Sequence, residues 1–281
     1  MRLMDAVGSF ACTVMAQSGV LLIQASKFLS TMMVLLSGKM LSLTPRMIST
    51  CVSTNQLPPL RQSSLSSTTS MAVAFALAPV PGPNCQNYCF KLALDLQAVI
   101  ISPDYRLAPE NRLPAAIEDG YMAVKWLQAQ AMSEEPDTWL TDVADFSKVF
   151  ISGDSAGGNI AHNLAVRLGA GSPELAPVLV RGYVLLAPYF GGTVKSKSEA
   201  EGPKEAFLNW ELIDRFWRLS IPIGETTDHP LVNPFGPQSR SLEPLDLDPI
   251  LVVMGGSDLL KDRAKDYAER LQKLGKRYPV R

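Results

Sequence analysis

KVFISGDSAGG, residues 148–158, is the stretch that decides the fold of this chain. Its first five residues form a short, mostly apolar run that predicts a buried strand, and residues 156–168 carry the pattern of a helix. Between the two lies a G-x-S-x-G motif, from Gly153 to Gly157. A turn this tight needs small residues around its serine so that the backbone can close. The sequence therefore predicts a strand–turn–helix unit with Ser155 at the turn.

This setting suits Ser155 for nucleophilic chemistry. The turn lifts its hydroxyl above the sheet, and the N-terminus of the following helix favours negative charge that develops nearby. The backbone N–H of Ala156 is then one donor to an oxyanion. The alternative is a glycine-rich turn in which the serine has no chemical role.

A serine nucleophile needs a base, and the base needs an acid that orients it. Asp258 is the candidate acid because it directly follows an apolar run at residues 249–254. Asp262 is the neighbouring candidate, although it already lies on the next predicted helix. The alternative role for Asp258 is to cap that helix, and one residue can do both.

The base is the difficulty, because the chain has only two histidines, His162 and His229. His162 follows Ser155 by two helical turns, so we expect a packing or surface role for it. His229 lies in a predicted loop, where a structural role is expected, and the remote alternative is that it substitutes for the missing base. The sequence therefore offers no triad histidine.

The same pattern of strands and helices extends along the chain on both sides of the motif. Apolar runs recur at residues 98–102, 148–152, 180–187 and 249–254, and helical spacing is found at residues 114–131, 156–168 and 259–274. Strands that alternate with helices predict βαβ units, hence an α/β fold with a mostly parallel, doubly wound sheet.

The first 80 residues differ in composition from the rest, with five basic residues, one acid and a low-complexity stretch at residues 62–70. Three explanations stay open: a tail foreign to the fold, a targeting peptide, or an anchor across the charge-free residues 6–26, which are too polar for a strong membrane span. We place residues 1–83 in an unrelated, disordered or targeting-like segment and residues 84–281 in the folded domain. The expected location is cytoplasmic, with the plastid as alternative if residues 1–80 act as a transit peptide.

Composition limits the class of protein and its partners. The chain has 281 residues, 47% of them hydrophobic, which is enough for a large core and excludes a disordered or collagen-like chain. A net charge of −1 gives no strong attraction to nucleic acid or anionic lipid, so neither partner is expected. All four cysteines lie within the first 89 residues and form no disulfide framework, which suits a reducing compartment.

A second motif, DYRLAPE at residues 104–110, leaves the first predicted strand and is followed by RLPAA at residues 112–116. We expect Arg106 to bridge Asp104 and Glu110 across a charged turn. Together with GDSAGG at residues 153–158, this motif makes the chain resemble the hormone-sensitive-lipase group of α/β-hydrolases, and most closely the plant carboxylesterases. The resemblance covers residues 84–281.

The resemblance implies hydrolysis of carboxylic esters, or of lactones, by an acyl-enzyme mechanism without a metal or an organic cofactor. It makes Ser155 the nucleophile and Asp258 the triad acid. It places Gly153, Gly157 and Gly158 in the turn around the serine, and Ala156 in the oxyanion site. It also implies a cap-like insertion at about residues 189–237. In that insertion an aromatic and apolar stripe either packs in the core or walls a pocket: Phe207, Trp210, Ile213, Phe216 and Trp217.

Two features of the family are missing. Residues 78–83 read APVPGP where a His-Gly-Gly oxyanion loop is expected, and no histidine follows Asp258. We therefore expect an α/β-hydrolase domain that is incomplete at both ends, with central strands left as open edges and with impaired activity. The alternatives are a non-catalytic ligand receptor, like the gibberellin-receptor branch, and a truncated interaction protein.

Overall fold

The computed structural model of the chain describes residues 98–202 and 208–276, five strands between residues 12 and 77, and residues 89, 92–93 and 95–96. The described strands form a nine-stranded sheet in the order β1-β2-β9-β8-β7-β5-β6-β4-β3. Its centre, from β2 to β6, is parallel, and the two ends are antiparallel. The expected α/β class with a mostly parallel sheet is confirmed.

Four strands occupy the predicted runs: β6 (Ala98–Ser102), β7 (Ala144–Asp154), β8 (Val180–Leu186) and β9 (Ile250–Gly255). The predicted helices are α3 (Ala115–Met132), α5 (Ala156–Leu168) and α8 (Lys261–Lys273). Short helices lie between them: α4 (Thr138–Thr141), a 3-10 turn (Pro173–Leu175), α6 (Lys197–Glu201) and α7 (Trp210–Ser220).

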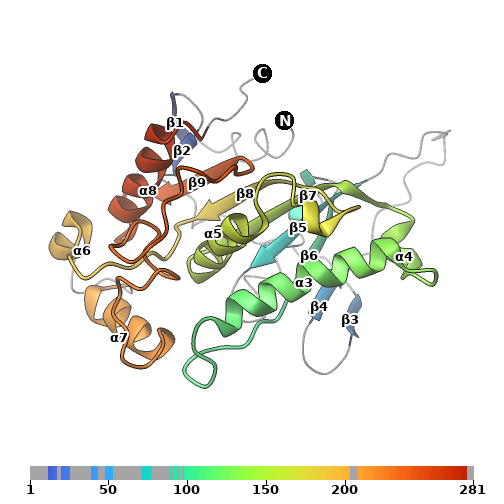
Figure 1. The fold of residues 1–281 in the computed structure, drawn as a ribbon, viewed down its shortest axis with the longest axis horizontal. Coiled ribbons are helices and arrows are strands. Elements are labelled where there is room, and N and C mark those ends of the chain that lie inside the picture. Colours follow the sequence, from blue (N-terminus) through green and yellow to red (C-terminus); the bar gives the residue numbers. More distant parts are fainter. Residues whose placement is uncertain are drawn as a thin grey trace.

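The core lies between the sheet and the helices α3, α5 and α8 (Figure 1). Alternate residues of β6, β7, β8 and β9 point to this layer, since side chains of a strand alternate between the two faces. Val99 and Ile101 of β6, for example, pack with Leu127 of α3 and Leu164 of α5 in one buried cluster. The intervening Ala98 and Ile100 instead pack on the other face, in a small cluster around Cys89.

The remaining strands come from the N-terminal segment: β1 (Cys12–Gln17), β2 (Val20–Ala25), β3 (Lys39–Leu43), β4 (Ile48–Val52) and β5 (Met71–Leu77). β2 pairs with β9, β4 pairs with β6, and β5 runs between β6 and β7. The central strands are therefore not open edges, in contrast to the expectation from sequence. The physical reason is that an unpaired strand edge accepts any extended segment of the chain that reaches it. The boundary at residue 84 stays a prediction.

The charged turn after β6 is built differently from the expectation. Arg106 does not bridge Asp104 and Glu110; its Nε and Nη2 donate to the carboxylate of Asp119 at 2.9–3.0 Å. Its backbone N–H also donates to Asp119, at 2.8 Å. Asp119 lies on α3 and is buried, so a bidentate arginine satisfies a charge that would otherwise be costly to bury.

Among the helices in the described part of the chain, none is both long and apolar enough to cross a membrane.

Candidate functional site

Ser155 sits between the end of β7 and the start of α5, with φ 54° and ψ −111°. A positive φ is rare for a residue with a side chain and stores backbone strain. Two hydrogen bonds across the sheet hold it: its N–H donates to the carbonyl of Leu186 at 2.9 Å, and its carbonyl accepts from the N–H of Tyr189 at 2.9 Å. The loop that leaves β8 therefore fixes the serine backbone from both sides.

The glycines around Ser155 are required by close backbone contacts. A Cβ on Gly153 would overlap the carbonyl group of Gly157, and a Cβ on Gly158 would lie 2.9 Å from the Cα of Pro188. These contacts let α5 start directly above the strand end. Ala156 is the first residue of α5, so its N–H belongs to the unpaired first turn of that helix.

Asp258 lies in the loop between β9 and α8, at the same end of the parallel sheet as Ser155. Its Oδ1 accepts the N–H of Leu260 at 2.9 Å, and its carbonyl accepts the N–H of Lys261 at 3.3 Å. Asp258 thus shapes the loop before α8, but it does not cap that helix, because the N-cap position is Leu260 and no side chain caps it. Asp262, the neighbouring candidate, instead accepts the N–H of Ser198 at 2.7 Å.

Asp154 adds a second carboxylate at this end of the sheet. Solvent reaches its side chain, but the surrounding protein removes part of its hydration, and this desolvation raises the pKa of the Asp154 carboxyl. The negative charge of Asp258 raises it further. The two carboxylates are therefore near enough to interact, and they make this end of the sheet electronegative.

Each histidine has a partner of its own in the structure. His162 is buried on α5, where its Nδ1 lies 2.9 Å from the hydroxyl of Tyr267 and its ring meets Phe190 and Tyr267 edge-on. Burial lowers the pKa of His162 to about 3, so its imidazole is neutral at physiological pH. His229 is half-buried in its loop, and its Nδ1 accepts the N–H of Leu231 at 3.2 Å.

The cap-like segment packs against the loop that leaves β8. Tyr189 stacks on Trp217 of α7, with ring centroids 3.9 Å apart and an interplanar angle of 5°, and its hydroxyl donates to the carbonyl of Ile213 at 2.6 Å. Ile213 and Trp217 are therefore core residues of this segment. Phe216 is exposed, and the ring of Trp210 lies under the Lys195 ammonium at 4.2 Å. Phe207 lies outside the described residues.

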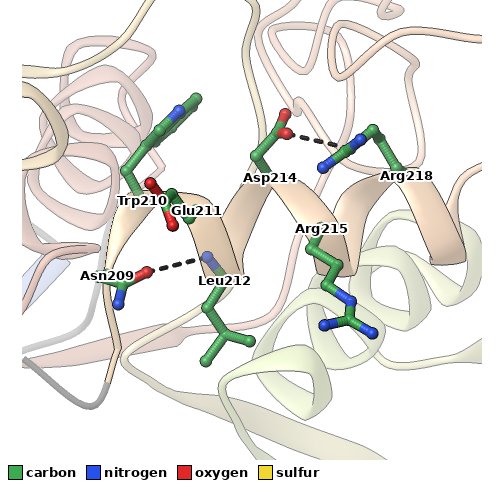
Figure 2. A pocket seen from close by; sticks show the side chains of 7 residues that line it. All are labelled: Asn209, Trp210, Glu211, Leu212, Asp214, Arg215 and Arg218. Carbon is green, nitrogen blue, oxygen red and sulfur yellow. Dashed lines mark hydrogen bonds and ion pairs between the residues drawn. The ribbon is translucent and has the colours of Figure 1, made fainter.

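The outer side of α7 borders a surface pocket of about 520 Å³ (Figure 2). All its lining residues belong to one stretch of chain: Asn209, Trp210, Glu211, Leu212, Asp214, Arg215 and Arg218. Asp214 and Arg218 pair across one helical turn at 3.0 Å, as the dashed line in Figure 2 shows. This pocket does not include Ser155 or Asp258.

Three residues that sequence reasoning missed organise the site: Tyr189, Arg112 and Arg263. Arg112 donates to the carbonyls of Arg218 and Ile221, at the C-terminus of α7. Arg263 donates to the loop after β8. Neither arginine carries a sequence signal for this role, since most of their partners are backbone carbonyls far away along the chain. The Ser196-x-x-Glu199 capping box would have revealed α6.

Among the residues that the structure describes, no group of three or more His, Cys, Asp or Glu side chains is placed to hold a metal ion.

The fold and the strained serine define an α/β-hydrolase. Residues 74–281 match the family described as alpha/beta hydrolase fold, and the chain belongs to this family. It is 37% identical to carboxylesterase 20 of Arabidopsis thaliana over 204 residues, which cover 72% of the chain and 61% of that relative. It is 40% identical to gibberellin receptor GID1C of the same plant over 188 residues, or 66% of the chain and 51% of the receptor. The resemblance to plant carboxylesterases is thereby confirmed.

Two further comparisons complete this picture. The chloroplastic tuliposide A-converting enzyme 1 of Tulipa gesneriana is 36% identical over 201 residues, which cover 72% of the chain and 49% of that enzyme. The hyperthermophilic esterase of Pyrobaculum calidifontis aligns in structure with a TM-score of 0.60 and 29% identity, over 74% of the chain and 65% of the esterase. The chain thus spans about half to three fifths of the length of these curated relatives.

Proposed function

We propose that this chain carries the nucleophile and the acid of a serine carboxylesterase. The observation that carries the proposal is the strained conformation of Ser155, held at the carboxyl end of the sheet beside the loop of Asp258. Strain of this kind persists only where the surrounding structure enforces it, and here two backbone hydrogen bonds and two crowded glycines do so. The carboxylesterase and esterase relatives support the same chemistry.

In the proposed reaction, Ser155 Oγ bonds to the carbonyl carbon of a small-molecule ester or lactone. The Ala156 N–H stabilises the resulting oxyanion, and the C–O bond to the alcohol breaks as the alcohol leaves with a proton. Water then attacks the acyl-enzyme, which releases the acid and restores the serine. No metal or organic cofactor is needed for these steps.

The proton transfers need a base, and we propose that neither His162, which is buried beside Tyr267, nor His229, whose Nδ1 accepts the N–H of Leu231, provides it. The role of Asp258, to orient a histidine, is then unfulfilled in the sequence as printed. Loss of a triad base costs on the order of 10⁶ in turnover. We therefore propose impaired hydrolysis by this chain.

The test is hydrolysis of a p-nitrophenyl ester by the chain and by the Ser155→Ala variant. Ser241→Ala is a matched control, since Ser241 is an exposed serine distant in sequence from the site. We expect slow hydrolysis that Ser155→Ala removes and Ser241→Ala keeps. Equal rates in all three proteins would contradict the proposal.

A second candidate function is a non-catalytic hormone receptor. Two observations favour it: the Nδ1 atoms of both histidines contact groups other than the serine, and the gibberellin receptor is as similar as the carboxylesterase. This candidate predicts saturable binding of gibberellic acid in calorimetry, without hydrolysis of any ester. An absence of heat at millimolar ligand would remove it.

For location, we propose the cytoplasm, with the plastid as alternative. The chloroplastic tulip relative supports the alternative, as does the acid-poor, serine-rich composition of residues 1–80. A fluorescent protein fused after residue 80 distinguishes the two locations.

A further inference from the structure

All three nitrogens of the Arg263 guanidinium donate hydrogen bonds. Its Nε and Nη2 donate to the two carboxylate oxygens of Glu199 at 2.5 and 2.7 Å. Its Nη1 donates to the carbonyl of Gly191 at 2.9 Å, and Nη2 also donates to the carbonyls of Gly192 and Val194 at 3.2 and 2.9 Å. We call this set of contacts the Arg263 clamp.

The clamp is buried, which sets it apart from the other ion pairs of α8. The side chains of Arg263 and Glu199 are 14% and 1% exposed, whereas those of Arg270 and Asp266 are 49% and 57% exposed. A buried charge that loses its partner is strongly destabilising, whereas an exposed ion pair contributes little to stability. The structure therefore depends on both members of the buried pair.

The clamp joins the two loops that flank Ser155. Residues 191–194 continue directly from Tyr189, whose N–H holds the Ser155 carbonyl. Arg263 stands on the first turns of α8, which begins just after Asp258. A second set of bonds strengthens the junction: Ser198 Oγ donates to the carbonyl of Leu259 at 2.7 Å, and Ser198 N–H donates to Asp262.

The glycine at position 192 leaves room for the Arg263 guanidinium. A Cβ on Gly192 would overlap Arg263 Nη1, so a side chain at this position would displace the arginine. Glu199 is also tied down from its other side, because its Oε2 accepts the N–H of Ser196 at 2.7 Å in the capping box of α6. Glu199 therefore cannot move with Arg263 if the arginine leaves the clamp.

We propose that Arg263 is a positioning residue, whose guanidinium fixes the loop after β8 against the start of α8 and thereby sets where Asp258 stands relative to Ser155. The role of Asp258 in this statement rests on the proposed function. The mechanical part, that Arg263 holds these two loops together, does not.

The experiment compares amide hydrogen exchange in the full chain and in Arg263→Met, with Arg270→Met as the matched control from the same helix. The Leu260 amide reports on Asp258, whose Oδ1 it contacts. We expect exchange at Leu260 and at residues 191–194 to rise by at least about tenfold relative to α5 in Arg263→Met, and to stay unchanged in Arg270→Met. Acceleration of all amides in equal proportion, or of none, would overturn the proposal.

A second pair of variants keeps the test decisive if Arg263→Met does not fold. Gly192→Ala leaves Arg263 unchanged but adds a methyl group that displaces its guanidinium. Arg263→Lys keeps the positive charge but lacks the five N–H donors of a guanidinium. We expect both to loosen the same amides. We also expect Gly192→Ala to cost less stability in an Arg263→Lys background, because the smaller head group removes the overlap. If the stability costs of Gly192→Ala and Arg263→Lys simply add in the double variant, the proposed contact between Gly192 and the guanidinium is contradicted.

Hydrolysis of a p-nitrophenyl ester is measured on the same proteins. If Ser155-dependent hydrolysis is present, Arg263→Met lowers kcat while KM stays within about twofold, because the loop after β8, which holds the Ser155 backbone through Tyr189, has loosened. If the chain shows no Ser155-dependent hydrolysis, the proposed function fails, and the exchange data still decide whether Arg263 holds the two loops.

Discussion

At the scale of single residues, Ser155 is the most constrained position of the site. Its φ of 54° is enforced by hydrogen bonds to Leu186, at the end of β8, and to Tyr189, in the loop after β8, rather than by its own preference. The sequence could predict this residue, because the motif of small residues around a serine has a steric reason. It could not predict Tyr189, which supplies one of the enforcing bonds, since nothing in the sequence pairs residue 189 with residue 155.

The missing base leads to a prediction about Asp258. Where a histidine is present, loss of the triad carboxylate lowers turnover by about 10⁴. Under the proposed function Asp258 has no histidine to orient, so we expect Asp258→Asn to change the rate of ester hydrolysis by less than about tenfold. Steady-state kinetics on the purified variant measure this.

The amide oxygen of asparagine can still accept the Leu260 N–H, so this variant keeps the local fold. Thermal unfolding serves as the control for that point. A loss of several thousandfold in a well-folded Asp258→Asn protein would show that a base is present after all.

At the scale of elements, the helices and central strands follow from hydrophobic periodicity. α5 has the predicted bounds, and α3 and α8 differ from them by one or two residues. β7 is the main departure, since it begins at Ala144 instead of Lys148. Its first four residues alternate apolar Ala144 and Phe146 with polar Asp145 and Ser147 instead of forming an apolar run, and the pairing with β5 shifts register there.

The close contact between α5 and the loop after β8 predicts the effect of Gly158→Ala. The added methyl group would lie 2.9 Å from the Cα of Pro188, and backbone on both sides leaves little room for it. We expect a loss of roughly 1–3 kcal/mol in the free energy of unfolding. Urea denaturation followed by circular dichroism measures the loss.

Gly171→Ala is a useful comparison, because a Cβ there meets nothing within 4 Å and only its φ of 69° is unfavourable. We expect its cost to be about 1 kcal/mol, the usual penalty for a left-handed residue with a side chain. If the two variants were equally stable, crowding at Gly158 would not be the reason for that glycine.

The end of α7 depends on Arg112, which leads to a further prediction. The Arg112 guanidinium donates hydrogen bonds to the carbonyls of Arg218 and Ile221, and the Leu113 N–H donates to the carbonyl of Ser220 at 2.8 Å. We expect Arg112→Met to accelerate amide exchange in the last turn of α7 severalfold, because helix C-termini need partners for their carbonyls.

Arg215→Met is the control for this experiment, since Arg215 lies on the exposed side of the same helix. Equal exchange rates in both variants and in the parent chain would show that Arg112 does not support α7.

At the scale of the whole molecule, one layer of helices and one sheet produce the core and the site together. The carboxyl ends of β7 and β9 bring Ser155 and Asp258 to the same edge, which the parallel sheet makes predictable from sequence. The edges of the sheet were not predictable, because the pairing of β2 with β9 and of β4 with β6 joins segments more than 40 residues apart that carry no shared pattern.

Burial of His162 in this core predicts the response of stability to acid. Its pKa falls from 6.5 in the unfolded chain to about 3 in the fold, so between these values only the unfolded state binds the proton. Stability therefore decreases as pH falls below about 6.5, by up to about 1.4 kcal/mol per pH unit, and is unaffected by this group above it.

Replacement by a side chain that does not titrate isolates this effect. We expect His162→Gln to flatten the decrease in stability between about pH 6.5 and about pH 5, measured by urea denaturation. Ser241→Ala, at an exposed position without a titratable group, serves as control and should keep the parent slope. An identical slope in His162→Gln and the parent chain would contradict the burial of a neutral imidazole.

The central claim, that Ser155 is an esterase nucleophile without its own base, is tested most directly by adding that base in solution. Hydrolysis of a p-nitrophenyl ester is measured against imidazole concentration for the parent chain and for Ser155→Ala, and the difference between the two isolates the serine. We expect a difference in rate that is small without imidazole and grows with the imidazole concentration. A difference of zero at every concentration would contradict the assignment of Ser155 as the nucleophile.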